Sequence, residues 1–128
     1  MKERKEKNAI LQQSDRYIME KLWTKSPLTT LQLYNELKEE LGWSKSTVFT
    51  LLGRMTEKGI IYYEENGRAK QYYPAIGPEE AAAAETASLL KRVFKGSAGM
   101  MLNTMLKENM FSKEEIDELY NIMLTQKR

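Results

Sequence analysis

A helix-spaced stripe of apolar side chains between Gly42 and Gly59 constrains the fold more than any other stretch of this sequence. The positions i, i+3, i+4 and i+7 are occupied by Val48, Leu51, Leu52 and Met55. This spacing gathers the four side chains on one face of a helix, which is stable only when that face is buried against other elements. Ser44 is a good N-cap and Gly59 a good left-handed terminator, so the sequence predicts a helix that ends near Lys58.

The opposite face of this predicted helix carries hydrogen-bond donors and cations. Its side chains are Lys45, Ser46, Thr47, Thr50 and Arg54. No carboxylate follows until Glu57. A face of this kind is typical of a helix that meets DNA, because acid there would repel phosphates. A structural helix whose exposed face is incidentally basic is the alternative. Phe49 fits either interpretation, as a partly buried edge residue or as a contact to a thymine methyl group.

Two shorter amphipathic helices are expected before this one. The first is predicted to start at a Ser14 cap, and its apolar stripe is Ile18, Met19, Leu22 and Trp23. Pro27 ends it and leaves Leu28 in a short extended link. The second is predicted to start at a Thr30 cap, and its stripe is Leu33, Leu37 and Leu41. Gly42 then terminates the second helix in a left-handed conformation.

A β-hairpin is expected directly after the third helix. Ile60–Glu64 and Ala69–Tyr73 are rich in β-branched and aromatic residues, and the dipeptide "NG" at 66–67 is a strong turn signal. Three helices followed by a hairpin are the order of a winged helix-turn-helix, in which the hairpin is the wing. Arg68 and Lys70 lie near the turn, where a wing meets phosphates or the minor groove. A plain solubilising turn is the alternative.

Composition excludes most classes of enzyme. The 128 residues include no Cys and no His, so the sequence offers no thiolate nucleophile, no histidine base and no cysteine or histidine metal site. It also lacks a Gly-rich phosphate loop, and we therefore expect no enzyme activity, no cofactor and no metal. No apolar run approaches the ~20 residues of a membrane span, which predicts a cytoplasmic protein without membrane insertion. Residues 1–77 hold 13 Lys and Arg against 10 Asp and Glu, a modest basic excess.

Three more helices are predicted from Pro78 onward, so the expected fold class is mainly α. Gly96 and Gly99 separate a first helix from a Met-rich second one. Ser112 and Glu115 have the spacing of a capping box at the start of the third.

These three helices carry more apolar side chains than they can bury among themselves, so a second copy of the chain is expected to cover the excess. The side chains assigned to this dimer contact are Leu89, Leu90, Val93, Phe94, Leu102, Met105, Leu106, Ile116, Leu119, Tyr120 and Met123. The expected organisation is a winged-helix DNA-binding domain at 1–77 and a helical dimerisation domain at 78–128. A hydrophobic ligand pocket in the Met-rich stretch 100–110 is the alternative.

Four segments give the chain a family resemblance. The segments are "SDRYIMEKLW", "WSKSTVFTLLGRMTEKGII", "NGRAKQYYP" and "FSKEEIDELYNIM", which span Ser14 to Met123. With them the chain resembles the penicillinase-repressor (BlaI/MecI/CopY) family of bacterial regulators. The resemblance implies a homodimeric repressor that binds double-stranded DNA at inverted-repeat operators, often ahead of β-lactamase, resistance or metal-homeostasis genes. The DNA-contact positions that it implies are Ser44, Lys45, Ser46, Thr47, Thr50, Arg54 and Arg68.

The sequence departs from the family pattern in several places, one of which is the motif "SDAE", where this chain has Arg16 and Tyr17. Lys45-Ser46 stands where the staphylococcal pattern has Pro-Lys, which displaces a basic contact by one residue. The Cys-x-Cys pairs of the copper-responsive branch are missing. The proteolytic site of the β-lactamase repressors, an Asn-Phe bond, is matched by Asn103-Thr104. The resemblance therefore makes this bond the candidate cleavage position and a membrane sensor protease pathway a candidate partner.

The sequence as a whole predicts a DNA-binding transcriptional repressor that acts as a homodimer without a cofactor. A small-molecule-responsive winged-helix regulator is one alternative, and the Met-rich stretch is its only support. A winged-helix module that binds proteins is another, because winged helices can use the same face for either partner. The basic face of the third helix and the basic wing favour DNA.

Overall fold

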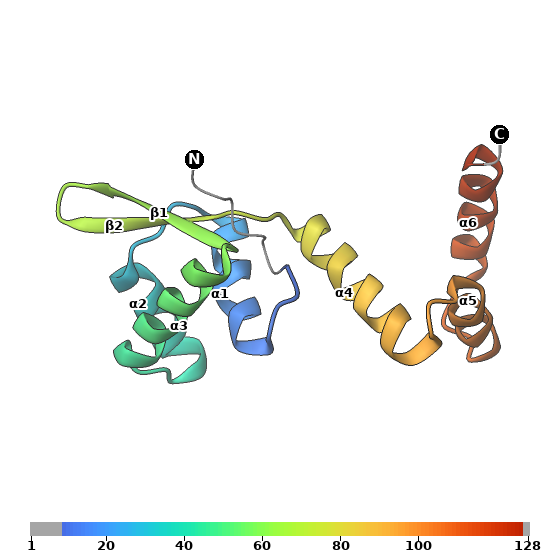
Figure 1. Cartoon of the computed structure of the whole chain (residues 1–128), viewed down its shortest axis with the longest axis horizontal. Helices are drawn as coiled ribbons and strands as arrows, with labels where there is room; N and C mark the ends of the chain where they lie inside the picture. The colour runs from blue at the N-terminus through green and yellow to red at the C-terminus, as the bar shows by residue number, and fades with distance from the viewer. Residues whose placement is uncertain (1–8, 127–128) are drawn as a thin grey trace. The chain divides into compact units, whose positions relative to one another are not determined.

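The computed structural model describes residues 9–126 as six helices and one β-hairpin (Figure 1). The elements are α1 (Gln13–Thr24), α2 (Thr30–Leu41), α3 (Lys45–Lys58), β1 (Ile61–Asn66), β2 (Ala69–Pro74), α4 (Pro78–Phe94), α5 (Ala98–Lys107) and α6 (Lys113–Gln126). The predicted order of three helices, a hairpin and three helices is confirmed. The chain divides into two compact units, the first ending at Thr86 and the second beginning at Ala87. This division lies inside α4, and the functional boundary between residues 77 and 78 stays a prediction.

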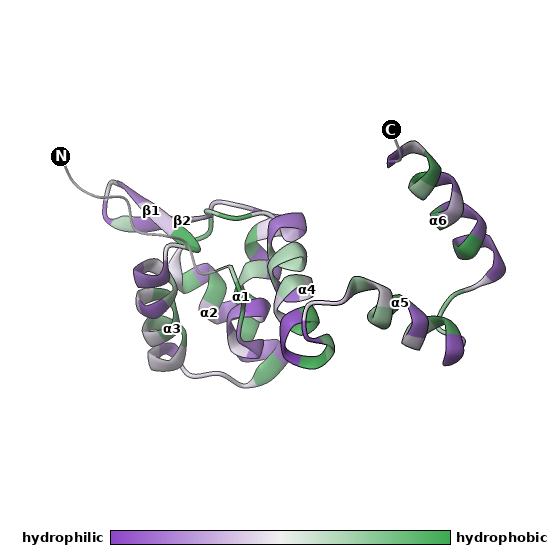
Figure 2. Cartoon of the chain, turned by 45° about the vertical axis from the view of Figure 1, so that its right-hand side comes forward, coloured by the Kyte–Doolittle hydropathy of each residue, from purple (hydrophilic) through white to green (hydrophobic). Residues whose placement is uncertain are grey.

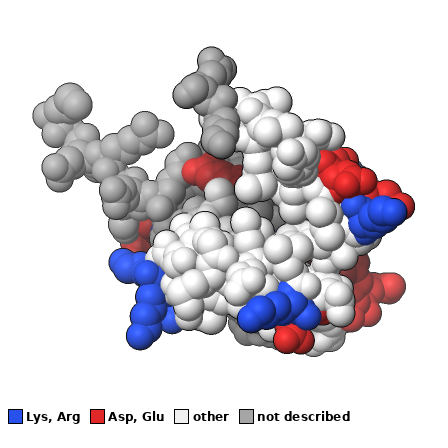
Figure 3. Space-filling view, turned by 90° about the vertical axis from the view of Figure 1, so that its right-hand side faces the viewer, with Lys and Arg blue, Asp and Glu red and all other residues white. Residues whose placement is uncertain are grey.

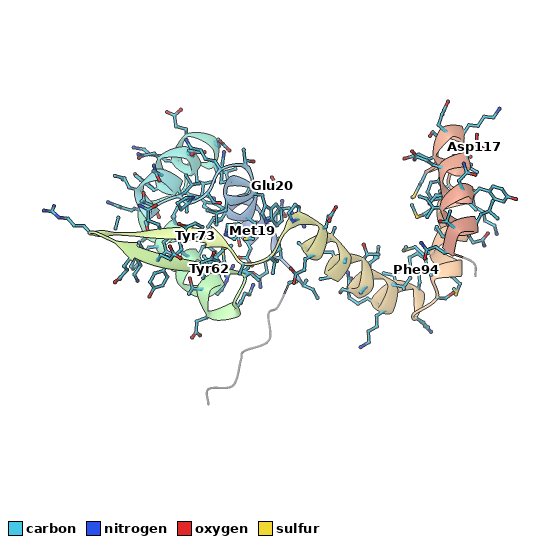
Figure 4. All side chains as sticks on the ribbon, turned by 90° about the horizontal axis from the view of Figure 1, so that it is seen from above. Met19, Glu20, Tyr62, Tyr73, Phe94 and Asp117 are labelled. Atoms are coloured by element: carbon cyan, nitrogen blue, oxygen red, sulfur yellow. The ribbon has the colours of Figure 1, made fainter. Side chains whose placement is uncertain are left out.

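The core of the first unit forms where the apolar faces of α1, α2 and α3 meet the hairpin. The predicted stripe of α3 is buried along its whole length, at Val48, Leu51, Leu52 and Met55. In α1, Met19 is fully buried whereas Glu20 beside it is exposed, as expected for an amphipathic helix (Figure 4). Figure 2 shows hydrophobic and hydrophilic residues mixed along each helix, as expected for amphipathic helices. Burial of these stripes is the main force that holds the three helices together.

The ends of α3 follow the sequence prediction. Ser44 is the N-cap, and its Oγ accepts the Thr47 N–H at 3.1 Å. Gly59 ends the helix with φ +81°, and Gly42 ends α2 with φ +70°. Both angles lie in the left-handed region, which glycine adopts without the steric penalty of a Cβ.

The predicted starts of α1 and α2 are wrong. Thr29 rather than Thr30 caps α2, because Thr29 and Gln32 exchange two bonds: the Gln32 N–H reaches Thr29 Oγ1 at 3.2 Å and the Thr29 N–H reaches Gln32 Oε1 at 2.8 Å. This capping box satisfies two backbone donors, one more than a Thr30 cap alone. Ser14 lies inside α1, whose N-cap is Gln12.

The stripe of α2 is also shorter than predicted. Leu33 and Leu37 are fully buried, but Leu41 is 37% exposed. Leu41 is the last residue of α2, immediately before the left-handed Gly42. The chain turns away at this point, so the third position of the stripe does not reach the core.

The hairpin turn lies one residue later than "NG" suggested. Asn66 is the last residue of β1 and pairs with Ala69, so Gly67 and Arg68 form the two-residue turn. Gly67 has φ +85°, and glycine is favoured at the first turn position because it tolerates a positive φ. Leu28 adds a short bridge to β2, with its N–H and carbonyl bonded to Tyr72 at 3.2 and 2.9 Å. The extended link predicted at Leu28 is thus confirmed.

The first turns of α4 are held against α1. The indole N–H of Trp23 donates to the Ile76 carbonyl at 2.8 Å, just before α4 begins at Pro78. Ala81 is buried, and Arg16 pairs with Glu85 at 2.8 Å. These contacts make the N-terminal half of α4 part of the first unit.

The second unit consists of the rest of α4 together with α5 and α6. Ser112 and Glu115 form the predicted capping box at the start of α6, with N–H to side-chain distances of 2.9 and 3.0 Å. Within Ala98–Lys107 and Lys113–Gln126 no side chain is fully buried. This unit therefore has stable local helix signals but no closed core of its own in a single chain.

Candidate DNA interface

The outward face of α3 is built from small polar side chains. Because successive residues of a helix are rotated by about 100°, Ser46, Thr50 and Gly53 lie on the side of α3 opposite the buried stripe. The predicted contacts Ser44, Lys45, Ser46, Thr47 and Thr50 are all exposed. The structure thus brings these five residues together on one surface at the start of α3. Their role in binding DNA stays a prediction.

The N-terminus of α3 is a favourable site for an anion. Ser44 Oγ lies 3.2 Å from Ser46 Oγ and 3.0 Å from Thr47 Oγ1, so three hydroxyls cluster at the helix end. The unpaired backbone amides and the positive end of the helix dipole add to the attraction for phosphate. Lys45 contributes a full positive charge at the same end.

Arg54 has a partner within the chain that the sequence analysis did not foresee. Its guanidinium donates to Asp15 Oδ1 at 2.6 Å and to Ser14 Oγ at 3.3 Å. Lys58 binds the other oxygen of Asp15 at 2.7 Å. Asp15 is fully buried, so its charge is compensated by two cations of α3, and the three charges together sum to +1. Arg54 as a direct DNA contact stays a prediction, but its charge is already engaged.

A signal for this ion cluster is present in the sequence. Asp15 stands three, four and seven residues before Ile18, Met19 and Leu22, so it belongs to the buried stripe of α1. A carboxylate in an apolar stripe requires a buried counter-charge. The sequence does not say which cation supplies it, because Arg54 and Lys58 are about forty residues away and only the folded chain brings them near.

The charge of Asp15 is maintained by its two partners. Burial alone raises the pKa of the Asp15 carboxyl, but the hydrogen bonds and charges of Lys58 and Arg54 outweigh this effect and lower the pKa below its usual value of 3.8. Asp15 is therefore ionised in the folded protein at neutral pH. Arg54 Nε is buried and lacks a hydrogen-bond partner among the described residues, so the guanidinium is held from one side only.

The wing presents one cation at its turn and a second beside it. Arg68 is exposed in the two-residue turn. Lys70 is also exposed, but its Nζ lies 4.4 Å from the centroid of the Tyr63 ring and its strand position faces Glu65. On the other face of the hairpin, Tyr62 and Tyr73 stack at 5.2 Å (Figure 4). Of the two predicted wing contacts, Lys70 is therefore the one that already has contacts within the hairpin.

The side chains assigned to dimerisation lie on the surface of the second unit. Those most exposed are Leu89, Val93, Leu106, Ile116, Tyr120 and Met123, at 39–64%. Those half-buried are Leu90, Phe94, Leu102, Met105 and Leu119. An apolar hollow of about 190 Å³ runs between α5 and α6 and is lined by Leu102, Leu106, Phe111, Ile116, Leu119, Tyr120 and Met123. Figure 3 shows a broad uncharged area bordered by charged side chains on the face that it draws.

The candidate cleavage bond lies in the middle of α5. Asn103 and Thr104 are both exposed, within the regular helix Ala98–Lys107. Across residues 9–126, no group of three or more acidic, Cys or His side chains could hold a metal ion. No helix in the same range is long and apolar enough to cross a membrane.

Comparison with known proteins now identifies the family. The family model described as "Penicillinase repressor" matches residues 11–125. The chain belongs to the penicillinase-repressor family. It is 31% identical to the penicillinase repressor of Bacillus licheniformis over 106 residues, which covers 83% of each protein. It is 24% identical to the methicillin resistance regulatory protein MecI of Staphylococcus aureus, covering 83% of this chain and 86% of MecI.

Two solved structures of family members support the winged-helix fold. The solution structure of the DNA-binding domain of the repressor BlaI matches with a TM-score of 0.52 and 26% identity, over 59% of this chain and 93% of that one. The monomeric form of Bacillus licheniformis BlaI in complex with the blaP half-operator matches with a TM-score of 0.50 and 27% identity, over 55% and 85%. These family members are repressors rather than enzymes, in agreement with the prediction from composition.

The Asp15 cluster makes the stability of this penicillinase-repressor family member depend on pH. The pKa of Asp15 is lower in the folded state than in the unfolded state. The ion pairs of Asp15 therefore contribute fully to the free energy of unfolding above the unfolded pKa, and this contribution is lost as pH falls through the folded pKa. We expect Asp15→Asn to lower the free energy of unfolding at pH 7 by about 2–3 kcal/mol, below the value for a fully buried pair because both cations are partly exposed. The variant should lose less stability than the parent between pH 7 and pH 3.

Urea unfolding followed by tryptophan fluorescence tests this expectation. Both tryptophans, Trp23 and Trp43, lie in the first unit and report on it alone. Glu20→Gln is the matched control, because Glu20 is an exposed carboxylate on the same helix as Asp15, in the unit that the tryptophans report on (Figure 4). If Asp15→Asn loses as much stability in acid as the parent does, Asp15 is not the titrating group.

Proposed function

We propose that this chain is a sequence-specific DNA-binding transcriptional repressor that binds an inverted-repeat operator as a homodimer. The observation that carries the proposal is the outward face of α3, where hydroxyls and a lysine stand without a carboxylate before Glu57 while the opposite face anchors the helix in the core. Such a helix fits the major groove and brings donors to phosphates and base edges. A relative solved with a half-operator lends support.

The exposed residues of α3 divide into two roles in this proposal. Ser44, Lys45 and Ser46 lie at the helix N-terminus and bind phosphate, where hydroxyls, amides and the dipole act together. Thr47 and Thr50 lie further along and reach base edges. Arg68, at the turn of the wing, binds the neighbouring phosphates.

Arg54 acts in this proposal as a positioning residue and not as a DNA contact. It ties α3 to the start of α1 through the buried Asp15, so it fixes the angle at which α3 leaves the core. A phosphate would have to compete with a carboxylate that is already 2.6 Å away.

The genes under control are proposed to be of the β-lactamase or resistance type. The support is the names of the relatives, a penicillinase repressor and a methicillin resistance regulatory protein. We infer that the protein works in the cytoplasm, where an operator is accessible. If a membrane sensor protease pathway relieves repression at Asn103-Thr104, α5 must first unwind locally, since that bond lies within a helix.

Dimerisation is proposed to use the apolar surface of the second unit. Side chains such as Tyr120 and Met123 are 64% and 57% exposed, which is costly for a monomer in water. A second copy of the same surface would cover them in a two-fold contact. A small hydrophobic ligand in the hollow between α5 and α6 is the alternative, favoured by the apolar lining of that hollow.

The first prediction from the proposed function concerns the outward face of α3. Thr50→Glu should abolish operator binding, a loss of about 100-fold or more, because a carboxylate would face phosphates and acceptor base edges. The melting temperature should hardly change, since Thr50 is exposed. The measurement is a thermal melt beside a titration against duplex DNA with an inverted repeat. Thr86→Glu, an exposed threonine in α4, is the control for added charge. Unchanged DNA binding by Thr50→Glu would favour the protein-interaction alternative.

The second prediction separates the two arginines. Arg68→Ala should weaken binding to all duplexes and lower the salt slope by roughly one unit, because it removes one phosphate contact. Arg54→Ala should weaken specific binding and also lower the melting temperature, because it removes a partner of Asp15. Titrations at several salt concentrations and a thermal melt distinguish them. An Arg54→Ala variant of parental stability with a reduced salt slope would restore Arg54 as a phosphate contact.

The third prediction concerns the second unit. The full chain should sediment as a dimer at micromolar concentration, and Met123→Asp should shift it to monomer, because a charge would be buried in an apolar contact. Asn121→Asp, an exposed polar position on the same helix, is the matched control and should remain dimeric. A monomeric parent chain would overturn the proposed dimer.

A further inference from the structure

A large aromatic side chain stands exposed on the recognition surface of α3. Phe49 is 65% exposed, although Val48 before it and Leu52 after it are fully buried. The core below α3 is therefore complete without Phe49. An exposed phenylalanine adds no core stability and leaves apolar area in water, so its position calls for a contact outside the folded chain.

Phe49 borders an open hollow at the N-terminal end of α3. The hollow has a volume of about 440 Å³ and is lined by Thr30, Lys45, Ser46 and Phe49. Thr30 is the first residue of α2, so the hollow spans the two helices of the helix-turn-helix. Lys45 and Ser46 lie one turn before Phe49 on α3 and place a cation and a hydroxyl beside the ring.

Gly53 has no side chain, so the helix backbone is open to close approach beside Phe49. It lies four residues after Phe49, in the interior of α3, where glycine is less stable than alanine. A Cβ added at Gly53 would meet nothing within 4 Å in the described part of the chain. Packing within the protein therefore does not require glycine here. A surface that approaches α3 closely would favour it, and a base or backbone in a major groove is such a surface.

We infer that Phe49 reads thymine, by packing its ring against the C5-methyl group of one thymine in each half-site. This inference rests on the proposed function and deepens it, because it names a base that the repressor selects. The thymine methyl is the one apolar group that B-DNA presents in the major groove, and phenylalanine is among the side chains that contact it. Lys45 beside the ring favours a polyanion over an apolar protein partner.

The test removes one methyl group at a time from the DNA. A duplex is first selected from a randomised pool with the full chain, and each thymine is then replaced singly by deoxyuridine, which differs from thymine by that methyl alone. We expect one position in each half-site to lose about fourfold in affinity, the value for burying one methyl group. In Phe49→Ala the same replacement should have no effect, although the variant melts at the parental temperature.

A matched control keeps the result specific to Phe49. Leu31 is also apolar and 54% exposed, but it does not line the hollow, so Leu31→Ala should retain the parental loss at that thymine. If no thymine of the selected duplex responds to deoxyuridine, or if Phe49→Ala responds as the parent does, the inference is overturned while the proposed function stands. If the parent selects no duplex at all, the proposed function fails and the inference with it.

Discussion

The orientation of α3 depends on one buried carboxylate. Asp15 is fully enclosed at the start of α1, and an unpaired charge in that position would cost several kcal/mol. Arg54 and Lys58, one turn apart on α3, bind its two oxygens at 2.6 and 2.7 Å. A large rotation of α3 relative to α1 would move these two cations away from the carboxylate. Apolar packing holds the helices together, and the ion cluster selects the angle at which the proposed DNA-binding face is presented.

The ion cluster also changes which charges are free to meet DNA. The cations of α3 are Lys45, Arg54 and Lys58, and Asp15 cancels one of the two charges that bind it, so this cluster keeps one net positive charge. In the proposed interface, the attraction of α3 for phosphate comes from Lys45, from the hydroxyls near Ser44 and from the helix dipole, and the net charge of the Asp15 cluster adds to it. Arg68 adds a charge from the wing. The proposed interface also offers uncharged groups, which are the small side chains along the outward face of α3 and the ring of Phe49 at its flank.

The second unit follows a different physical logic. Its helices have good caps, including the reciprocal bonds of Ser112 and Glu115, yet α5 and α6 bury no side chain completely. Local signals are enough to define where these helices begin and end. A helical layer with one apolar side needs a second layer, and a single chain supplies too little of it. The proposed homodimer would supply that layer from an identical surface.

The sequence by itself determined the order of the elements, the buried stripe of α3 and the left-handed ends at Gly42 and Gly59, because each depends on residues within a few positions of one another. It also placed the donors of α3 on one face. The caps predicted at Ser14 and Thr30 were wrong, because the nearby residues Gln12 and Thr29 take the N-cap positions instead. Only the tertiary structure decided that Arg54 and Lys58 pair with Asp15. A charge on a helix is equally free to face DNA or a buried acid, and only the packing of distant helices settles which of the two it meets.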